Sequence, residues 1–171
     1  MEQDTVYRKY RDEVIILLGT GLRISEFCGL TTALDFKNRQ INVDHQLLRD
    51  ADIGYYIETP KTKNGIRQIP MSREVYQALK RVLKNRGNAA PFSVEGYKNF
   101  LFLKNDGMPK VSANYDSMLK GLVKKYNKQN KEQLPNITPH ILRHTFCTRL
   151  ANAGMNPKAL QYIMGPVSYT H

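Results

Sequence analysis

The sequence predicts a single α+β domain, mainly α-helical with one small antiparallel β-sheet, and three observations support this fold class. The chain has 171 residues, 41% of them hydrophobic, which suits one domain with its own core. Apolar residues recur at helical spacing over most of the chain. Segments with strand character are confined to residues 33–70, where turn residues separate them.

The amino-terminal part is expected to be helical. Residues 5–18 carry apolar side chains at helical spacing, and Gly19 and Gly21 are expected to break this helix. Arg23 follows the break directly. Residues 24–30 are predicted to form a second, short helix.

The β-sheet is predicted from two hairpins. Residues 33–36 and 39–43 flank a Lys-Asn turn, and residues 55–58 and 66–70 flank a polar tip that contains Lys-Asn-Gly. Such alternation around turn residues is typical of antiparallel strands. The second hairpin therefore places lysines at its tip.

Helices are expected to resume after Ser72, a predicted N-cap residue. Further helices are predicted around residues 93–97, 113–127, 138–152 and 157–164. A short extended segment is expected at residues 100–103.

The charge pattern indicates a polyanionic partner. The formal net charge is +11 and the pI is about 9.7. Residues 71–131 hold thirteen Lys and Arg residues against four acidic residues. An excess of one sign costs self-repulsion and usually serves binding to nucleic acid or to an anionic membrane surface. Any single lysine is best interpreted as part of a solvated helix face, whereas the group favours a phosphate backbone.

Several other classes are disfavoured. The chain has no apolar run of about 18 residues, the length that a membrane span needs, and its start is too polar for a signal peptide. Its two cysteines, Cys28 and Cys147, lie far apart in apolar helical patterns, so we expect buried thiols. These features predict a cytoplasmic protein.

The segment GTGLRISE, residues 19–26, is the first of three that could carry chemistry. Glycines permit a tight turn, so Arg23 would project from a fixed point at the start of a helix. Taken alone, an arginine in this position is more often structural.

The second segment is PKTKNGIRQIP, residues 60–70, which places Lys61 and Lys63 at the tip of the predicted hairpin. Such a tip can enter a DNA groove, and a lysine beside other cations can donate a proton to a leaving alkoxide. Protection of an edge strand by charge is the competing interpretation.

The third segment is TPHILRH, residues 138–144. Thr138 is suited to cap a helix, and His140 and Arg143 would then share one face at i, i+3 spacing. Arginine supplies a planar fork of donors and histidine exchanges a proton near neutral pH, a combination that suits a pentavalent phosphorus. A structural role is the alternative for His140.

A zinc site is a weaker interpretation of the same stretch. His140 and His144 have the i, i+4 spacing of zinc ligands on a helix. No acidic residue lies between them, no further ligand cluster is near in sequence, and Arg143 adds a cation. The sequence therefore predicts neither a metal nor a cofactor.

Four motifs together resemble the catalytic domain of tyrosine recombinases of the phage integrase family. They are TGLRISE, KTKNGIR, TPHILRHTFCTRLANAGMNPKALQYIMG and a terminal YTH. The similarity to integrases of conjugative transposons and phages is the strongest. It extends over nearly the whole chain, so residues 1–171 are expected to be one catalytic domain, without the separate amino-terminal domain that binds the opposite face of DNA in this family.

The resemblance implies site-specific DNA recombination and the integration of a mobile genetic element in a bacterium. A tyrosine attacks the scissile phosphate, forms a 3′-phosphotyrosyl bond and releases a 5′-hydroxyl, without metal or ATP. The implied partners are double-stranded DNA and other copies of the chain, as a tetramer on paired sites, with no membrane. By position, the implied catalytic residues are Arg23, Lys61 or alternatively Lys63, His140, Arg143 and Tyr169.

The carboxyl-terminal end departs from the family pattern. Gly165 is followed by Pro166, where the family has a second histidine, and Tyr169 comes only three residues after that position. Tyr162 is the other nearby tyrosine, and its helical spacing with neighbouring apolar residues predicts packing instead. The nucleophile segment is therefore expected to be shortened or altered.

Three alternatives to an active recombinase follow. A catalytically impaired DNA-binding fragment or regulator is favoured by the missing histidine. A type IB topoisomerase shares the covalent chemistry, but the integrase-like motif TPHILRHTF and the Gly-Met-Asn-Pro turn argue against it. A basic RNA-binding domain lacks the expected exposed aromatic platform.

Overall fold

The computed structural model describes residue 1 and residues 4–60, 65–86 and 92–165. In chain order the elements are η1 (Arg8–Tyr10), α1 (Arg11–Thr20), α2 (Ile24–Gly29), β1 (Gln40–Val43), β2 (Gln46–Asp50), β3 (Gly54–Glu58), β4 (Arg67–Pro70), α3 (Arg73–Asn85), β5 (Ser93–Val94), β6 (Tyr97–Lys98), α4 (Ser112–Gln129), α5 (Pro139–Asn152) and α6 (Pro157–Met164). Helices dominate, with short antiparallel strand pairs, which confirms the predicted fold class.

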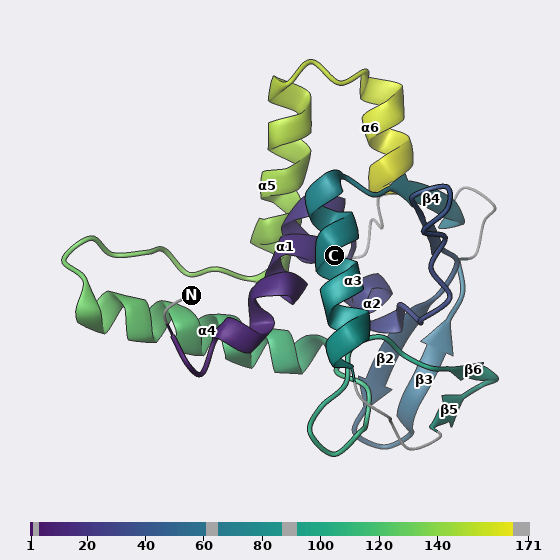
Figure 1. Ribbon diagram of the computed structural model, residues 1–171, viewed down its shortest axis with the longest axis horizontal. Helices are drawn as coiled ribbons and strands as arrows, with labels where there is room; N and C mark the ends of the chain where they lie inside the picture. The colour runs from purple at the N-terminus through teal and green to yellow at the C-terminus, as the bar shows by residue number, and fades with distance from the viewer. Residues whose placement is uncertain (2–3, 61–64, 87–91, 166–171) are drawn as a thin grey trace.

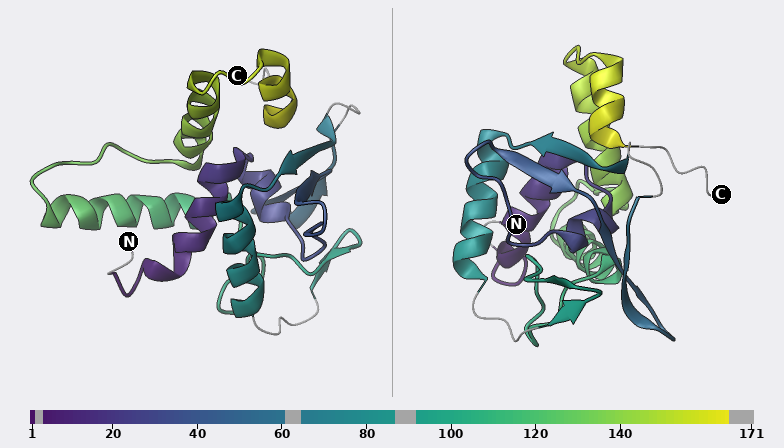
Figure 2. Two further views of the ribbon diagram at one scale, coloured as in Figure 1. Left: turned by 45° about the horizontal axis from the view of Figure 1, so that its top comes forward. Right: turned by 90° about the vertical axis from the view of Figure 1, so that its right-hand side faces the viewer.

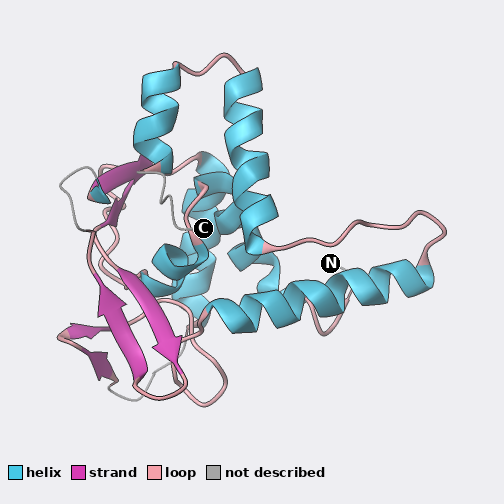
Figure 3. Cartoon of the chain, turned by 180° about the vertical axis from the view of Figure 1, so that it is seen from behind, coloured by secondary structure: helices cyan, strands magenta, loops and turns pink. Residues whose placement is uncertain are grey.

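Figure 1 shows the short helix α2 near the centre of the molecule, with helices on one side of it and the strands on the other. Helix α1 packs against α3 and α5, and α2 packs against β2. Helix α4 extends to one side, and α5 and α6 rise as neighbours from one end of the molecule, which the two further views in Figure 2 confirm. The hairpins β2–β3 and β5–β6 lie at the other end, seen from behind in Figure 3. This places the amino-terminal turn of α5 and the carboxyl-terminal end of α6 beside the central body.

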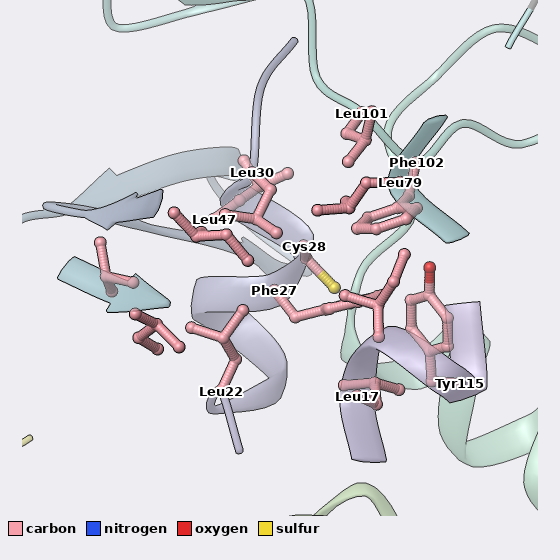
Figure 4. Close-up of a cluster of buried hydrophobic side chains, with 14 of the residues drawn as sticks. Leu17, Leu22, Phe27, Cys28, Leu30, Leu47, Leu79, Leu101, Phe102 and Tyr115 are labelled. Carbon is pink, nitrogen blue, oxygen red and sulfur yellow. The ribbon is translucent and has the colours of Figure 1, made fainter. Parts of the chain in front are cut away.

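The core joins α1 and α2 to the chain around α3 and α4. Phe27 stacks on Phe102 with ring centroids 4.0 Å apart and meets Tyr115 edge-on at 5.3 Å, and all three are fully buried. Figure 4 shows the Cys28 side chain inside the same cluster. Cys28 is buried as expected, whereas Cys147 is only half-buried.

Local sequence signals set several helix ends where they were predicted. Ser72 Oγ accepts a hydrogen bond from the Val75 N–H at 3.2 Å, and Thr138 Oγ1 accepts one from the Ile141 N–H at 3.3 Å. Asn156 caps α6 by accepting from the Lys158 N–H at 2.9 Å. These side chains satisfy backbone donors that the first turn of a helix leaves without partners, so helices α3, α5 and α6 begin there.

Of the two glycines predicted to break the first helix, only Gly21 does so. Gly19 does not break the helix: it lies inside α1, where a Cβ atom would lie 2.4 Å from the Val75 side chain. Gly21 ends the helix in a left-handed conformation with φ +62°, and a Cβ atom there would lie 2.2 Å from the Phe146 ring. Gly19 therefore serves the packing of α1 on α3, and Gly21 the packing of α1 on α5.

The predicted strand pairing was wrong. The strand at Arg67–Pro70 pairs with Gln40–Val43, and Gly54–Glu58 pairs with Gln46–Asp50. Residues 33–36 form no strand and contribute only an isolated bridge from Asp35. The described strands thus form three separate two-stranded pairs. The pairs β2–β3 and β5–β6 are hairpins of adjacent strands, whereas β1 and β4 are brought together from distant parts of the chain, which local turn signals cannot reveal.

The helix predicted around residues 93–97 was also wrong. This stretch forms the hairpin of β5 and β6, and its turn residues Glu95 and Gly96 both have positive φ, +48° and +87°. Two left-handed residues suit the turn of a tight two-residue hairpin and interrupt a helix. The extended segment predicted at residues 100–103 is confirmed as non-helical chain with isolated bridges at Phe100 and Leu103.

Candidate active site

Arg23 lies at the point where α2 begins. Its backbone N–H donates a hydrogen bond to Glu26 Oε2 at 2.9 Å, and its Nη1 donates to Glu26 Oε1 at 3.0 Å. The Arg23 side chain keeps 26% of its surface exposed. The predicted fixed position of this guanidinium is therefore what the local structure provides, with Glu26 holding both its backbone and its side chain.

Arg143 lies in the second turn of α5 and points to the ends of two other helices. Its Nη1 donates to the Gly21 carbonyl after α1, and its Nη2 donates to the Met164 carbonyl at the end of α6 at 2.6 Å. Burial, and next the neighbouring positive charge of Arg23, lower the pKa of Arg143 to about 10. The main cause is the cost of burying a cation, and the charge of Arg23 adds a repulsion that a bound anion would relieve.

Arg67 is a third arginine in this cluster, and sequence reasoning missed it. Its side chain is fully buried, and it donates to both Glu26 oxygens, from Nη1 at 2.9 Å and from Nη2 at 2.8 Å. Strand β4 alternates strictly, with Arg67 and Ile69 buried and Gln68 exposed. That two-residue alternation, counted back from Ile69, was the signal that could have placed Arg67 inside.

Glu26 is the carboxylate that holds this cluster together. Burial alone would raise its pKa, but hydrogen bonds and positive charge from Arg67, together with Arg23, hold the pKa below its ordinary value. As an acidic residue in the first turn of α2, Glu26 also interacts favourably with the helix dipole. Among the described residues, Glu26 is the carboxylate that forms ion pairs with both Arg23 and Arg67.

We call Arg23, Glu26, Arg67 and Arg143 the arginine cluster. Two of its guanidinium groups, those of Arg23 and Arg67, form ion pairs with the Glu26 carboxylate, and the third, that of Arg143, is near enough to feel the charges of all three residues. Arg23 and Arg143 retain surface that solvent can reach. Guanidinium forks of this kind bind phosphate in a planar, bidentate manner. The cluster is thus built to accept an anion at its surface while its buried side is neutralised.

His140 lies in the first turn of α5, three residues before Arg143, and its side chain is exposed. The Thr138 cap fixes the start of that helix, so both side chains project from one rigid element. His144 is also exposed, and in the part of the chain that the structure describes no group of three His, Cys, Asp or Glu side chains could hold a metal ion.

The remaining predicted catalytic residues, Lys61 with its alternative Lys63, and Tyr169, lie outside the described residues, as does Pro166. Described residues close in sequence to the lysine and tyrosine segments contact Arg67 of the arginine cluster. The Gly65 carbonyl lies 3.5 Å from Arg67 Nη1, and the Ile163 carbonyl accepts from Arg67 Nε at 2.7 Å.

Tyr162 was expected to pack against its neighbours on α6, and this was wrong. Its side chain is 54% exposed, and its hydroxyl oxygen accepts a hydrogen bond from the Gln68 N–H at 3.2 Å. Ile163 is the residue of this turn that is buried. Tyr162 therefore attaches α6 to the edge of β4 through its hydroxyl group.

The family model for the phage integrase family matches residues 2–171, and the chain belongs to that family. Its relatives are tyrosine recombinases and transposon integrases, which confirms the resemblance drawn from the sequence motifs.

Two curated relatives and two solved structures illustrate the similarity. The transposase from transposon Tn916 of Enterococcus faecalis is 66% identical over 163 residues, which are 95% of this chain and 40% of the relative. Tyrosine recombinase XerA of Pyrococcus horikoshii is 32% identical over 91% of this chain and 46% of the relative. The Tn1549 transposon integrase in complex with circular intermediate DNA superposes with a TM-score of 0.92 at 63% identity, covering 95% of this chain and 53% of that chain. A XerA recombinase superposes with a TM-score of 0.69 at 26% identity, covering 96% and 50%.

The chain thus spans about half the length of these relatives or less. Within the described residues, no helix is long and apolar enough to cross a membrane.

Proposed function

We propose that this chain is the catalytic domain of a site-specific DNA recombinase that cleaves and rejoins DNA through a 3′-phosphotyrosyl intermediate. The arginine cluster carries the proposal: two partly exposed guanidinium groups, Arg23 and Arg143, lie close enough for one charge to depress the pKa of the other. One scissile phosphate between them would relieve that repulsion and be held by both forks.

In the proposed reaction a tyrosine hydroxyl attacks the scissile phosphorus, a new P–O bond forms to tyrosine, and the bond to the 5′-oxygen breaks. Arg23 and Arg143 stabilise the negative charge that builds up on the equatorial oxygens. His140, exposed beside Arg143, donates a hydrogen bond or a proton to the same phosphate. The reverse attack by a different 5′-hydroxyl rejoins the strands, so bond energy is conserved and neither metal nor ATP is required.

We assign the two remaining roles from the resemblance. Lys61, or alternatively Lys63, protonates the leaving 5′-oxygen, and Tyr169 is the nucleophile. Support comes from the contacts of Arg67 on both sides, with Gly65 just after the lysine segment and with Ile163 just before the tyrosine segment. Chain segments that leave two neighbouring contacts can deliver both side chains to one phosphate.

The proposed substrate is double-stranded DNA at a transposon end. A related integrase was solved with circular intermediate DNA and another form of it with transposon right end DNA. The net charge of +11 suits phosphate-backbone binding with strong salt dependence. We propose action as a homotetramer on paired sites, with residues 1–171 as the catalytic domain of the recombinase in the bacterial cytoplasm.

A second candidate function is DNA binding without cleavage. Pro166 in place of the family's second histidine, and the short spacing to Tyr169, favour it. Such a chain would occupy recombination sites through its arginines and compete with active recombinases.

One assay separates the two candidates. The chain is incubated with a nicked suicide duplex that carries a transposon end, and products are separated on a denaturing gel. A covalent protein–DNA adduct that disappears in Tyr169→Phe supports the recombinase. Absence of an adduct, together with binding that weakens steeply as salt rises, supports the binding fragment.

A further inference from the structure

Arg67 is the most completely buried charged side chain described in this protein, and it makes no contact with solvent. It holds three partners at once: both oxygens of Glu26, the Ile163 carbonyl at 2.7 Å, and the Gly65 carbonyl at 3.5 Å. A guanidinium that is inaccessible to solvent is also inaccessible to DNA. Its role in the site must therefore act through its neighbours.

We propose that Arg67 is a positioning residue. By binding both oxygens of Glu26, Arg67 fixes the Arg23 guanidinium for phosphate binding and links that guanidinium to the end of α6. The inference rests on the proposed function for its link to phosphate chemistry. The hydrogen bonds themselves are seen in the structure: they run from the Ile163 carbonyl through Arg67 and Glu26 to Arg23.

The two oxygens of Glu26 explain why the clamp needs an arginine. Oε1 accepts from both Arg23 Nη1 and Arg67 Nη1, and Oε2 accepts from both the Arg23 N–H and Arg67 Nη2. Each oxygen thus bridges the two residues, and four hydrogen bonds hold the carboxylate in this orientation. A lysine could supply the charge, but its single ammonium could not hold both oxygens and the Ile163 carbonyl.

The end of α6 is held from two sides by the same cluster. Arg67 takes the Ile163 carbonyl and Arg143 takes the next one, that of Met164. Gly165 then follows with φ +72°, and a Cβ atom there would lie 2.9 Å from the Arg67 guanidinium carbon. The end of α6 is therefore in direct contact with Arg67 and Arg143 of the arginine cluster.

The clamp also keeps Glu26 ionised. Charged groups face Glu26 from three elements, Arg23 at the start of α2, Arg67 of β4 and Arg143 of α5. Burial opposes ionisation, and hydrogen bonds from Arg67 are the largest effect in its favour. Without Arg67 the Glu26 pKa should rise, and a protonated Glu26 would hold Arg23 less firmly.

The test uses Arg67→Met and Arg67→Lys in the full chain, with Arg81→Met as the matched control. Arg81 also makes a bidentate pair with a carboxylate, Asp12 at 2.7 Å, but on the surface between α1 and α3. The first readout is rotation of the Arg23 guanidinium, measured by ¹⁵N NMR across pH 4 to 8 without DNA. The second is the rate of adduct formation on the suicide duplex.

In Arg67→Met, rotation of the Arg23 guanidinium should be about tenfold faster, the change expected when a charged hydrogen bond is weakened. The pH at which Arg23 loosens should rise relative to the wild type, and Arg67→Lys should return that pH toward the wild-type value. Adduct formation should fall about a hundredfold in Arg67→Met, since small displacements of a binding group have effects of this size. Arg81→Met should change neither readout.

An Arg23 signal that is unchanged at every pH in folded Arg67→Met and Arg67→Lys would overturn the proposal, even if both variants melt at lower temperature. If the wild type forms no adduct but Arg23 loosens as described, the recombinase function fails while the positioning role stands. If the wild type forms an adduct and both variants do so at the same rate, the positioning role fails and the recombinase function stands.

Discussion

Two clusters of charged side chains, one around Glu26 of α2 and one around Glu13 of α1, differ in how completely their charge is neutralised. In the arginine cluster, Glu26 faces Arg67, Arg23 and Arg143. In the second cluster, which we call the Glu13 cluster, Lys110 Nζ lies 2.6 and 2.9 Å from the Glu13 oxygens, and Tyr115 Oη donates to Oε2 at 2.5 Å. One cluster has cations in excess, and the other pairs one cation with one anion.

The cation of the Glu13 cluster, Lys110, also has an aromatic partner. The Lys110 ammonium also lies over the Tyr10 ring at 4.7 Å. Burial, and next the charge of Glu13, raise the pKa of both Tyr115 and Cys28, so the phenol and the thiol stay protonated. In this balanced group the charges are already paired with one another, which stabilises the fold. The arginine cluster has unbalanced positive charge that solvent can reach, so it is the better candidate for binding an anion.

The largest expected effect separates the clusters by stability. Glu13→Gln would leave the Lys110 ammonium, whose side chain is 12% exposed, without its anion, and the free energy of unfolding should fall by about 3–5 kcal/mol. Chemical denaturation measures this. Adding Lys110→Met should restore much of the loss, and DNA affinity of the folded fraction should not change. Reduced DNA affinity in the folded protein would show that the Glu13 cluster is not purely structural.

The next effect lies in the arginine cluster and concerns rate instead of stability. Arg143→Lys keeps a positive charge but loses the fork that reaches two carbonyls and, in the proposed function, a phosphate. Adduct formation should slow by about a hundred- to a thousandfold, roughly 3–4 kcal/mol, while DNA binding is retained. Cleavage at the wild-type rate would refute the assignment of Arg143.

A smaller effect is expected where α6 meets Arg67. Gly165→Ala places a side chain at φ +72°, ψ 175°, a conformation that glycine alone adopts readily, and directly against the guanidinium of Arg67. Unfolding free energy should fall by about 1–3 kcal/mol in thermal or chemical denaturation. Gly154→Ala is the control, because Gly154 also has positive φ but has open space around it. Equal losses in the two variants would mean that contact with Arg67 adds nothing.

The smallest effect is a pH dependence from Glu26. Its folded-state pKa lies below the ordinary value of 4.5, so its contribution to stability is complete above that value and is lost as pH falls through the lower folded-state pKa. Unfolding measured between pH 3 and 6 should therefore show a smaller loss of stability on acidification in Glu26→Gln than in the wild type. Identical slopes would mean that Glu26 is not held ionised by its arginines.

Features that depend on interactions between nearby residues were predicted correctly, and features that depend on distant residues were not. Helix α6 was predicted with its observed bounds, because Asn156, Pro157 and Gly165 mark its ends within a few residues. The strand pairs were predicted wrongly, since adjacent turns suggested partners for residues 55–58 and 66–70 that the fold does not use. Pairing depends on which faces become buried, and that information is spread over the whole chain.

For the candidate site, Arg23, His140 and Arg143 could be selected from the sequence because each follows a local signal, a glycine turn or a capped helix. The structure brings Arg23 and Arg143 together and adds Glu26 and Arg67. Arg67 carried a two-residue alternation with Ile69, yet an exposed role for any charged strand residue is the usual expectation.

Backbone capping and helical periodicity act over a few residues, so the class of fold, the capped helices and a set of phosphate-binding candidates could be predicted from the sequence. Which carboxylate neutralises which arginine depends on how distant segments pack. Glu26 and Arg67 are 41 positions apart, and Arg67 and Ile163 are 96 apart. Whether a buried charge is balanced depends on such distant partners, and that balance is what distinguishes the arginine cluster from the Glu13 cluster.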